Sequence, residues 1–210
     1  MSFFPFFIDL EGKNCVVAGG GMTAYRKTLA LLEYGAVVHV IAPEVISLFY
    51  EKRTAVGEKL TISERKVEEA DLEHAFVVIA ATNDNMANRR ISHYCKNHHI
   101  LVNVVDEKEE CSFYFPSLVK RGEIVIGITS GGNSPVFAKE LRKDIDSLLP
   151  EYYGELAERL GDLREVVKQR VENAESRKVC FEELLRLGKE REGRLTPEEI
   201  DEIISRYRKS

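Results

Sequence analysis

The sequence lacks any apolar run long enough to cross a membrane, which takes about 18 or more consecutive apolar residues. Its N-terminal segment is rich in phenylalanine, but it has no basic start of the kind found in signal peptides and reaches Asp9 and Glu11 early. We therefore expect a cytoplasmic protein with no membrane association.

Cysteine is sparse, and its spacing has no pattern. The four cysteines stand far apart, and no Cys-x-x-Cys pair occurs. This spacing argues against a disulfide framework and against the common zinc sites, so we expect reduced thiols and no metal site. The five histidines include no pair at i and i+4, which a helical zinc site would use. We expect His98 and His99 to interact with a helix end instead.

Positive charge is not in excess. The 210 residues carry 30 Lys and Arg against 35 Asp and Glu, a formal net charge of −5. A general nucleic-acid binder would need a basic surface, so this class of function is excluded. The length is sufficient for one large or two small domains with a substantial core.

The strongest motif follows a short apolar run at residues 14–18. Three consecutive glycines come next, and a helical pattern follows over residues 23–33. The spacing Gly19-x-Gly21-x-x-Ala24 is that of a dinucleotide fingerprint. In this motif the first glycine makes a tight turn, the second lets the backbone approach a pyrophosphate, and the small third residue lets helix pack on strand. The helix N-terminus then holds the phosphates. A tight turn without a ligand is the alternative.

The next strand is expected at residues 37–42. In many dinucleotide-binding folds an acidic residue at the end of this strand binds the ribose hydroxyls of the adenosine. Here Ala42 stands at that place, and the nearest carboxylate is Glu44, after Pro43. Because no arginine stands nearby to take a 2′-phosphate, the sequence favours NAD over NADP.

Strands and helices continue to alternate, which predicts an α/β fold with a doubly wound, Rossmann-type parallel sheet over residues 1–112. Strands are expected at residues 60–65, 76–81 and 100–105, and helices at 44–52 and 85–97. Thr82 and Asp106 each follow one of these strands. They are expected at the carboxyl edge of the sheet, where ligands bind in such folds.

The pattern changes after this sheet. Residues 113–116 and 123–128 are expected to form an antiparallel pair of strands around a turn at residues 120–122. Such a pair outside the main sheet needs a partner, and a twofold dimer commonly provides one. The small α+β segment at residues 113–148 is therefore expected to form a homodimer.

The remaining sequence is expected to be helical. Ser134 is a natural N-cap for a helix over residues 136–149, with proline suited to its first position. The segment 149–210 is rich in charge and has apolar residues at helical spacing, which predicts a C-terminal helical subdomain. Within it, Thr196 begins a capping box.

Together these motifs resemble the siroheme synthase family, whose members act as NAD-dependent precorrin-2 dehydrogenases and in some cases also insert iron into sirohydrochlorin. The resemblance covers roughly residues 3–150, with the motifs in family order. The matching stretches are Phe4-Pro5, Leu10-x-Gly12-Lys13, Gly19-Gly20-Gly21-x-x-Ala24-x-Arg26-Lys27, Ala80-Ala81-Thr82-x-Asp84-x-x-x-Asn88, Asn103-Val104-Val105-Asp106 and Ser130-Gly131-Gly132-x-Ser134-Pro135.

The resemblance implies a homodimer that uses NAD and the tetrapyrrole precorrin-2, and it implies that Asp106 is the catalytic acid–base residue. Dehydrogenation removes a hydride and a proton, and the proton needs a base. A turn or capping aspartate is the alternative for Asp106. The residues expected at the cofactor site are Gly19, Gly21, Met22, Thr23, Ala24, Pro43, Glu44 and Thr82.

The glycine-rich loop at residues 129–135 offers backbone N–H groups at a helix N-terminus, which suit the carboxylates of a tetrapyrrole. The residues expected to bind substrate are Ser130, Gly131, Gly132, Ser134, Arg121 and Arg142, with Lys120 and Lys143 as further basic partners. A simple helix cap beside a solvated basic face is the alternative. The serine at the position of Ser130 is phosphorylated in one branch of the family resembled.

The resemblance thus implies an oxidoreductase that converts precorrin-2 and NAD into sirohydrochlorin and NADH. One alternative is a bifunctional enzyme that also takes ferrous iron as a substrate and inserts it into sirohydrochlorin. The other is a nucleotide-sensing regulatory domain, which would share only the strand–glycine–helix opening. A sensor would need neither the stretch 103–106 nor the loop 129–135, and both are present.

Overall fold

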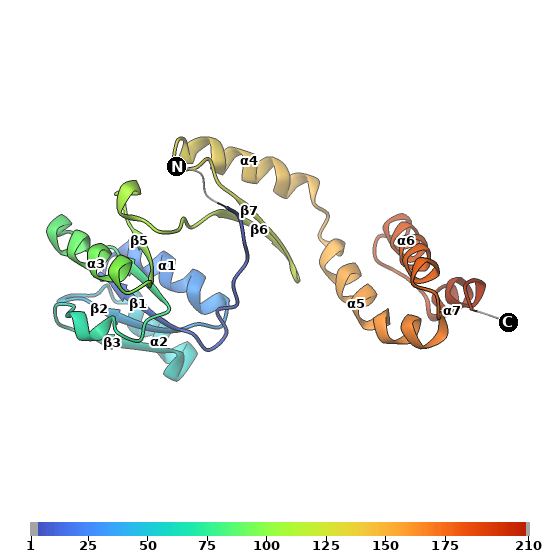
Figure 1. The fold of residues 1–210 in the computed structure, drawn as a ribbon, viewed down its shortest axis with the longest axis horizontal. Helices are drawn as coiled ribbons and strands as arrows, with labels where there is room; N and C mark the ends of the chain where they lie inside the picture. Colours follow the sequence, from blue (N-terminus) through green and yellow to red (C-terminus); the bar gives the residue numbers. More distant parts are fainter. Residues whose placement is uncertain (1–3, 209–210) are drawn as a thin grey trace. The chain divides into compact units, whose positions relative to one another are not determined.

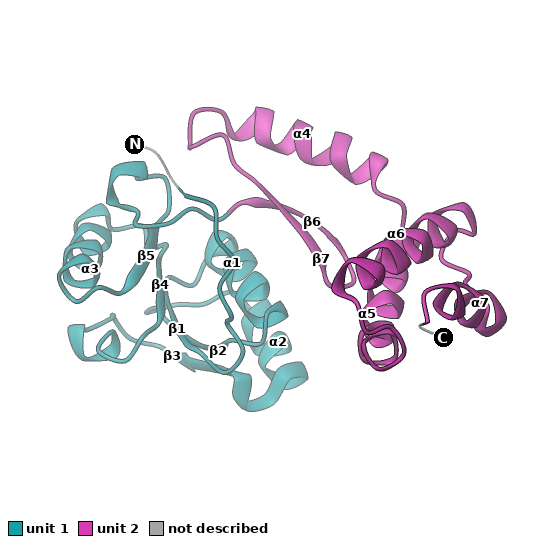
Figure 2. Ribbon diagram, turned by 45° about the vertical axis from the view of Figure 1, so that its right-hand side comes forward, with its two compact units in different colours: residues 1–115 teal, residues 116–210 magenta. Residues whose placement is uncertain are grey.

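The computed structural model of the chain describes residues 4–208. It contains two units with separate cores, one ending at Phe115 and the next beginning at Pro116 (Figures 1 and 2). The finer division of the second unit into a dimerisation segment and a helical subdomain stays a prediction.

The first unit is built on a five-stranded parallel sheet with the strand order β3-β2-β1-β4-β5. Its strands are β1 (Asn14–Ala18), β2 (Val37–Ile41), β3 (Leu60–Ser63), β4 (Val77–Ala80) and β5 (Leu101–Val104). This is the Rossmann order, in which the strand sequence reverses between β1 and β4 and leaves a crevice at their carboxyl ends. The predicted fold class is confirmed.

Helices cover both faces of this sheet (Figure 2). One face packs against α1 (Met22–Glu33) and α2 (Leu48–Val56), and the other against α3 (Asn85–Asn97). Successive strand residues alternate between the faces, so Val17 contacts the core under the first two helices and Val16 the core under the third. Because both faces are buried, the strands are apolar almost throughout. Short 3₁₀ helices, η1 (Gly57–Lys59), η2 (Glu69–Asp71) and η3 (Lys108–Glu110), lie in the loops.

Side chains cap both ends of α3. The Asp84 carboxylate accepts hydrogen bonds from the N–H groups of Met86, at 2.9 Å, and Ala87, at 3.1 Å. At the other end His98 is the C-cap residue, and its Nδ1 lies 2.8 Å from the carbonyl oxygen of Tyr94. The predicted helix-end role of His98 is confirmed.

The helix expected at residues 44–52 begins later, at Leu48. The preceding segment is held in another conformation because the N–H of Ile46 donates a 3.0 Å hydrogen bond to the carbonyl oxygen of Gly20. This bond joins the segment to the glycine-rich turn.

The strand expected at residues 113–116 is wrong. The antiparallel pair consists of β6 (Ser117–Arg121) and β7 (Ile124–Ile128), so the predicted turn residues 120 and 121 lie within a strand. The aromatic residues that suggested a strand, Phe113 and Phe115, pack against the core of the first unit instead. Gly122, with φ of +55°, makes the turn.

In the second unit α4 (Pro135–Leu148) packs on this hairpin, where Val119, Ile128 and Ala138 form a small core. The predicted N-cap is confirmed, since the Ser134 hydroxyl accepts a 3.2 Å hydrogen bond from the N–H of Phe137.

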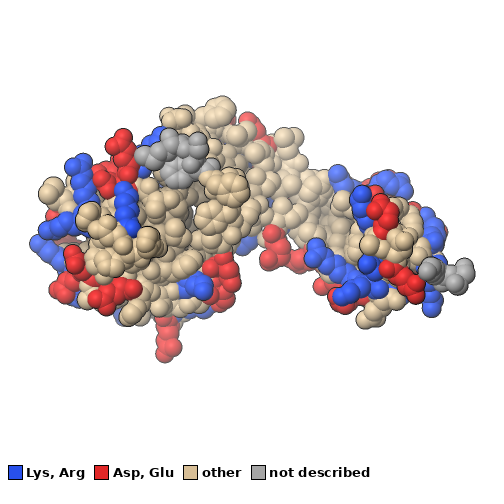
Figure 3. Space-filling view, in the orientation of Figure 1, with Lys and Arg blue, Asp and Glu red and all other residues tan. Residues whose placement is uncertain are grey.

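Three further helices, α5 (Tyr152–Arg170), α6 (Ala174–Glu190) and α7 (Pro197–Arg206), share an apolar core that includes Val167 and Leu184. The predicted capping box at Thr196 is present. Figure 3 shows acidic and basic side chains interspersed on the outside of these helices. None of the helices within residues 4–208 is long and apolar enough to span a membrane.

Two glycines of α5 provide a matched test of this packing. A Cβ at Gly154 would lie 2.7 Å from the carbonyl carbon of Arg121 and 2.8 Å from the nitrogen of Gly122, whereas a Cβ at Gly161 would meet nothing within 4 Å. We expect Gly154→Ala to lower the free energy of unfolding by about 1–3 kcal/mol through overpacking. We expect Gly161→Ala to raise it by up to about 1 kcal/mol, since alanine favours helix. Urea denaturation measures both, and equal stability of the two variants would contradict the close approach of α5 to the hairpin turn.

Candidate functional site

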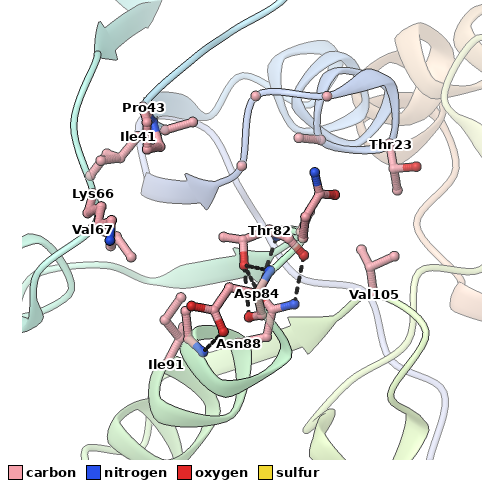
Figure 4. Close-up of a pocket in the computed structure, with 18 of the residues that line it drawn as sticks. Thr23, Ile41, Pro43, Lys66, Val67, Thr82, Asp84, Asn88, Ile91 and Val105 are labelled. Atoms are coloured by element: carbon pink, nitrogen blue, oxygen red, sulfur yellow. Dashed lines mark hydrogen bonds between the residues drawn. The ribbon is translucent and has the colours of Figure 1, made fainter.

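A cavity of about 1340 Å³ lies at the carboxyl edge of the sheet in the first unit (Figure 4). Residues from the loops after all five strands line it. The volume exceeds the range of about 300–1,000 Å³ typical of small-molecule pockets, so the cavity has room for an extended ligand such as a dinucleotide.

The three glycines after β1 have different roles. Gly19 has a φ of +134°, and a side chain there would collide with the carbonyl oxygen of Ala81. A side chain at Gly20 would collide with the carbonyl oxygen of Glu44. At Gly21 a Cβ would meet nothing within 4 Å, and this residue lines the cavity. The fold therefore requires the first two glycines, and the third leaves space for a ligand.

The N-terminus of α1 is open to an anion. Gly21 is the N-cap residue and has no side chain to satisfy the first N–H groups, and the first turn contains no acidic residue. Met22 and Thr23, in that turn, line the cavity. These N–H groups and the positive end of the helix dipole fit the pyrophosphate of a dinucleotide.

Hydrogen bonds make the loop after β4 rigid (Figure 4). The Thr82 hydroxyl donates to Oδ1 of Asn88 at 2.7 Å, and Nδ2 of Asn88 donates to the carbonyl oxygen of Thr82 at 3.0 Å. Asn88 is buried, and its side-chain amide both accepts hydrogen bonds through Oδ1 and donates one through Nδ2. This pair holds one wall of the cavity in place.

Asp106 follows β5 in a left-handed backbone conformation, with φ of +61°. Non-glycine residues adopt this conformation at a cost, and such residues cluster at functional sites. The surrounding loop is held by hydrogen bonds from Arg89 Nε to the Glu107 carboxylate, at 2.9 Å, and from the N–H of Val104 to the sulfur of Cys111, at 3.2 Å. Asp106 and Glu107 both line the cavity.

A lysine of α1 interacts electrostatically with this carboxylate. Burial lowers the pKa of Lys27, and the nearby Cys111 and Asp106 act in the opposite direction. The Lys27 ammonium also lies 4.1 Å from the centroid of the Phe115 ring, a favourable cation–π distance. Lys27 lies in one of the stretches on which the family resemblance rests. The dinucleotide fingerprint ends at Ala24, so it predicts no role for this lysine.

The cavity brings together every residue that the sequence predicted for the cofactor site, together with the predicted catalytic residue. These residues are Gly19, Gly21, Met22, Thr23, Ala24, Pro43, Glu44, Thr82 and Asp106. Two further positions were missed. Gly20 was treated as a spacer although it is a third glycine, and Lys66 has no recognisable sequence signal.

The residues predicted to bind substrate lie in the second unit, and their role stays a prediction. Internal hydrogen bonds shape their loop, since the Ser130 hydroxyl accepts from the N–H of Ser134 at 3.0 Å. Gly131 and Gly132 both have positive φ. Arg121 makes 3.0 Å ion pairs with Asp146 and Glu151, and Arg142 makes a 3.4 Å ion pair with Asp146. Within residues 4–208 no three His, Cys, Asp or Glu side chains gather as a metal site.

The strand order, the glycine-rich turn and the open helix N-terminus define a dinucleotide-binding protein of the Rossmann type. Residues 6–117 match the family described as "Putative NAD(P)-binding", and the chain belongs to that family. Its cofactor class is therefore a nicotinamide dinucleotide.

Two siroheme synthases are similar to most of the chain. That of Nitrosospira multiformis is 41% identical over 187 residues, which are 88% of this chain and 40% of the relative. That of Nitrosococcus oceani is 35% identical over 185 residues, 88% of this chain and 39% of the relative. The chain thus spans about two fifths of the length of these curated relatives.

A solved structure is similar over almost the whole chain. SirC, precorrin-2 dehydrogenase, matches with a TM-score of 0.76 and 25% sequence identity over 98% of both chains. The predicted resemblance to siroheme synthases is confirmed by these relatives.

Gly21 allows a test of the cofactor site that leaves the fold intact. We expect Gly21→Asp to abolish binding of NAD, because its carboxylate would occupy the space for the pyrophosphate and repel it. Nothing within 4 Å opposes the new side chain, so the melting temperature should stay near that of the wild type. Titration calorimetry measures the affinity.

Gly21→Ala is the control for size without charge, and it should weaken binding less than the aspartate does. An unchanged NAD affinity in folded Gly21→Asp would show that the pyrophosphate does not lie at this glycine.

Proposed function

We propose that the chain is an NAD-dependent precorrin-2 dehydrogenase of siroheme biosynthesis, which oxidises precorrin-2 to sirohydrochlorin. The observation that carries this proposal is a single cavity that joins an open α1 N-terminus to the carboxylate of Asp106. The similarity to siroheme synthases and to SirC supports this reaction over a nucleotide sensor.

The reaction needs a hydride acceptor and a base. When bound, the nicotinamide cofactor supplies hydride acceptance. The N–H groups at the start of α1 would hold its phosphates, and the hydrogen-bonded Thr82–Asn88 pair would form one wall of its site. The Asp106 carboxylate accepts the proton that the tetrapyrrole loses with the hydride. The nearby Asp106 carboxylate acts against the burial that lowers the pKa of Lys27, so the two groups interact electrostatically.

We propose NAD as the preferred nicotinamide cofactor. The residue at the end of β2, where acidic side chains bind ribose hydroxyls, is Ala42. Glu44 follows it and lines the cavity, so its carboxylate is available to the same hydroxyls. The proposal includes a cytoplasmic location, which fits the four buried free cysteines.

A substitution at Asp106 distinguishes a role in cofactor binding from a role in catalysis. Replacing it with asparagine keeps the size of the side chain but removes the base, which typically contributes ~10²–10⁴ in rate. We expect Asp106→Asn to bind NAD almost as tightly as the wild type and to oxidise precorrin-2 at least about a hundredfold more slowly. Calorimetry and the absorbance change on oxidation measure the two quantities.

Glu109→Gln is the control, because Glu109 lies in the same loop after β5 but is exposed and does not line the cavity. It should retain most of the activity. Near-normal oxidation by Asp106→Asn would remove this residue from the mechanism, and an unchanged spectrum with wild-type protein would favour the sensor. The same assay with sirohydrochlorin and ferrous iron tests the alternative of iron insertion.

We also propose that the chain forms a homodimer through the second unit. Along one side of α4 three large apolar side chains are exposed: Phe137 by 64%, Leu141 by 37% and Leu148 by 79%. Their spacing places them on one face of the helix, which also carries the exposed Asp144, and exposed apolar side chains on one face favour association.

Light scattering tests the assembly. We expect about twice the 23.9 kDa chain mass at micromolar concentration. Phe137→Glu together with Leu141→Glu should shift the protein to the monomer, because two charges would be buried in the contact. A wild type that is already monomeric would contradict the proposal.

A further inference from the structure

One end of the cavity lies where β2 and β3 finish. The two strands are parallel neighbours, and the N–H of Ala42 donates a 3.2 Å hydrogen bond to the carbonyl oxygen of Ser63. The segments that follow the strands therefore lie together. Figure 4 shows Lys66 and Val67 beside Pro43 at this end of the cavity.

In Rossmann folds the adenosine ribose lies at the carboxyl end of the second strand, where an acidic side chain binds the 2′-hydroxyl and a basic side chain accommodates a 2′-phosphate. Both kinds of charge are present here. Glu44 and Lys66 both line the cavity, and Lys66 lies beside Pro43, which precedes Glu44 in the chain (Figure 4). The basic residue comes from the loop after β3, which the sequence did not connect with the ribose.

Of the two basic side chains in this loop, only Lys66 is available to a ligand. Arg65 makes two hydrogen bonds to the Asp71 carboxylate, at 2.7 and 2.6 Å, and this pairing holds the pKa of Asp71 below its usual range. Arg65 also donates to the carbonyl oxygen of Lys66 at 3.0 Å, so the backbone of the lysine is fixed. Within residues 4–208 the exposed Lys66 ammonium makes no ion pair or hydrogen bond.

We propose that Lys66 determines cofactor specificity by binding the 2′-phosphate of NADP, so that this site accepts NADP as well as NAD. The inference rests on the proposed function for the placement of the cofactor. Glu44, Glu68 and Glu69 also line the cavity, and their negative charge makes NAD the tighter ligand of the two. Lys66 offsets this repulsion at the phosphate.

Titration calorimetry with NAD and NADP tests the inference without requiring catalysis. A hydrogen bond to a charged group contributes about 1.5–3 kcal/mol, which corresponds to roughly 10- to 150-fold in affinity. We expect Lys66→Ala to weaken NADP binding by at least about tenfold and NAD binding by less than about threefold. Lys66→Arg should retain NADP binding, and added salt should weaken NADP more than NAD.

The matched control is Lys59→Ala. Lys59 precedes β3, at the opposite end of the strand from Lys66, and does not line the cavity. Its replacement should change neither affinity. Wild-type protein that binds NAD but not NADP, or equal NADP affinity in Lys66→Ala, would overturn the inference and leave the proposed function standing. Failure to bind either dinucleotide would overturn both.

Discussion

The site depends on the close approach of three backbone loops at the carboxyl edge of the sheet. Gly19 contacts the loop after β4 at Ala81, and Gly20 contacts the segment after β2 at Glu44, so neither position has room for a side chain. This contact aligns the loops that bear the cavity walls. It also turns the chain so that α1 begins with its unsatisfied N–H groups facing the cavity. A side chain at either glycine would separate the loops and displace all of these groups together.

Around this contact the cavity divides into chemically different regions. In the proposed function, backbone N–H groups at α1 bind a phosphate, charged side chains from the loops after β2 and β3 contact a ribose, and Asp106 after β5 is the proposed base. Hydrogen bonds hold two of the loops that line the cavity: the Thr82–Asn88 pair holds the loop after β4, and the Arg89–Glu107 pair holds the loop after β5. Such support matters because catalytic groups act only when their geometry is held closely.

Much of this arrangement was predictable because its signals are local. The fingerprint predicted the turn and the helix that follows it. Continuous apolar runs predicted buried parallel strands, and Ser134 and Thr196 carried recognisable caps. The predictions of secondary structure were wrong where a local sequence pattern is compatible with two different structures. The consecutive aromatics at residues 113–115 are typical of a strand, yet the rings of Phe113 and Phe115 pack against the core of the first unit.

The sequence by itself determined most element types and the nucleotide-binding turn, because these follow from the periodicity or spacing of neighbouring residues, and its resemblance to the siroheme synthase family implied the candidate base. Only the tertiary structure decided that Gly20 has no room for a side chain, that Lys27 interacts with Asp106, and that Lys66 lies beside Pro43 in the cavity wall. These contacts join residues far apart in the chain. They depend on strand order and register, which bring distant loops to one edge of the sheet and which no local pattern specifies.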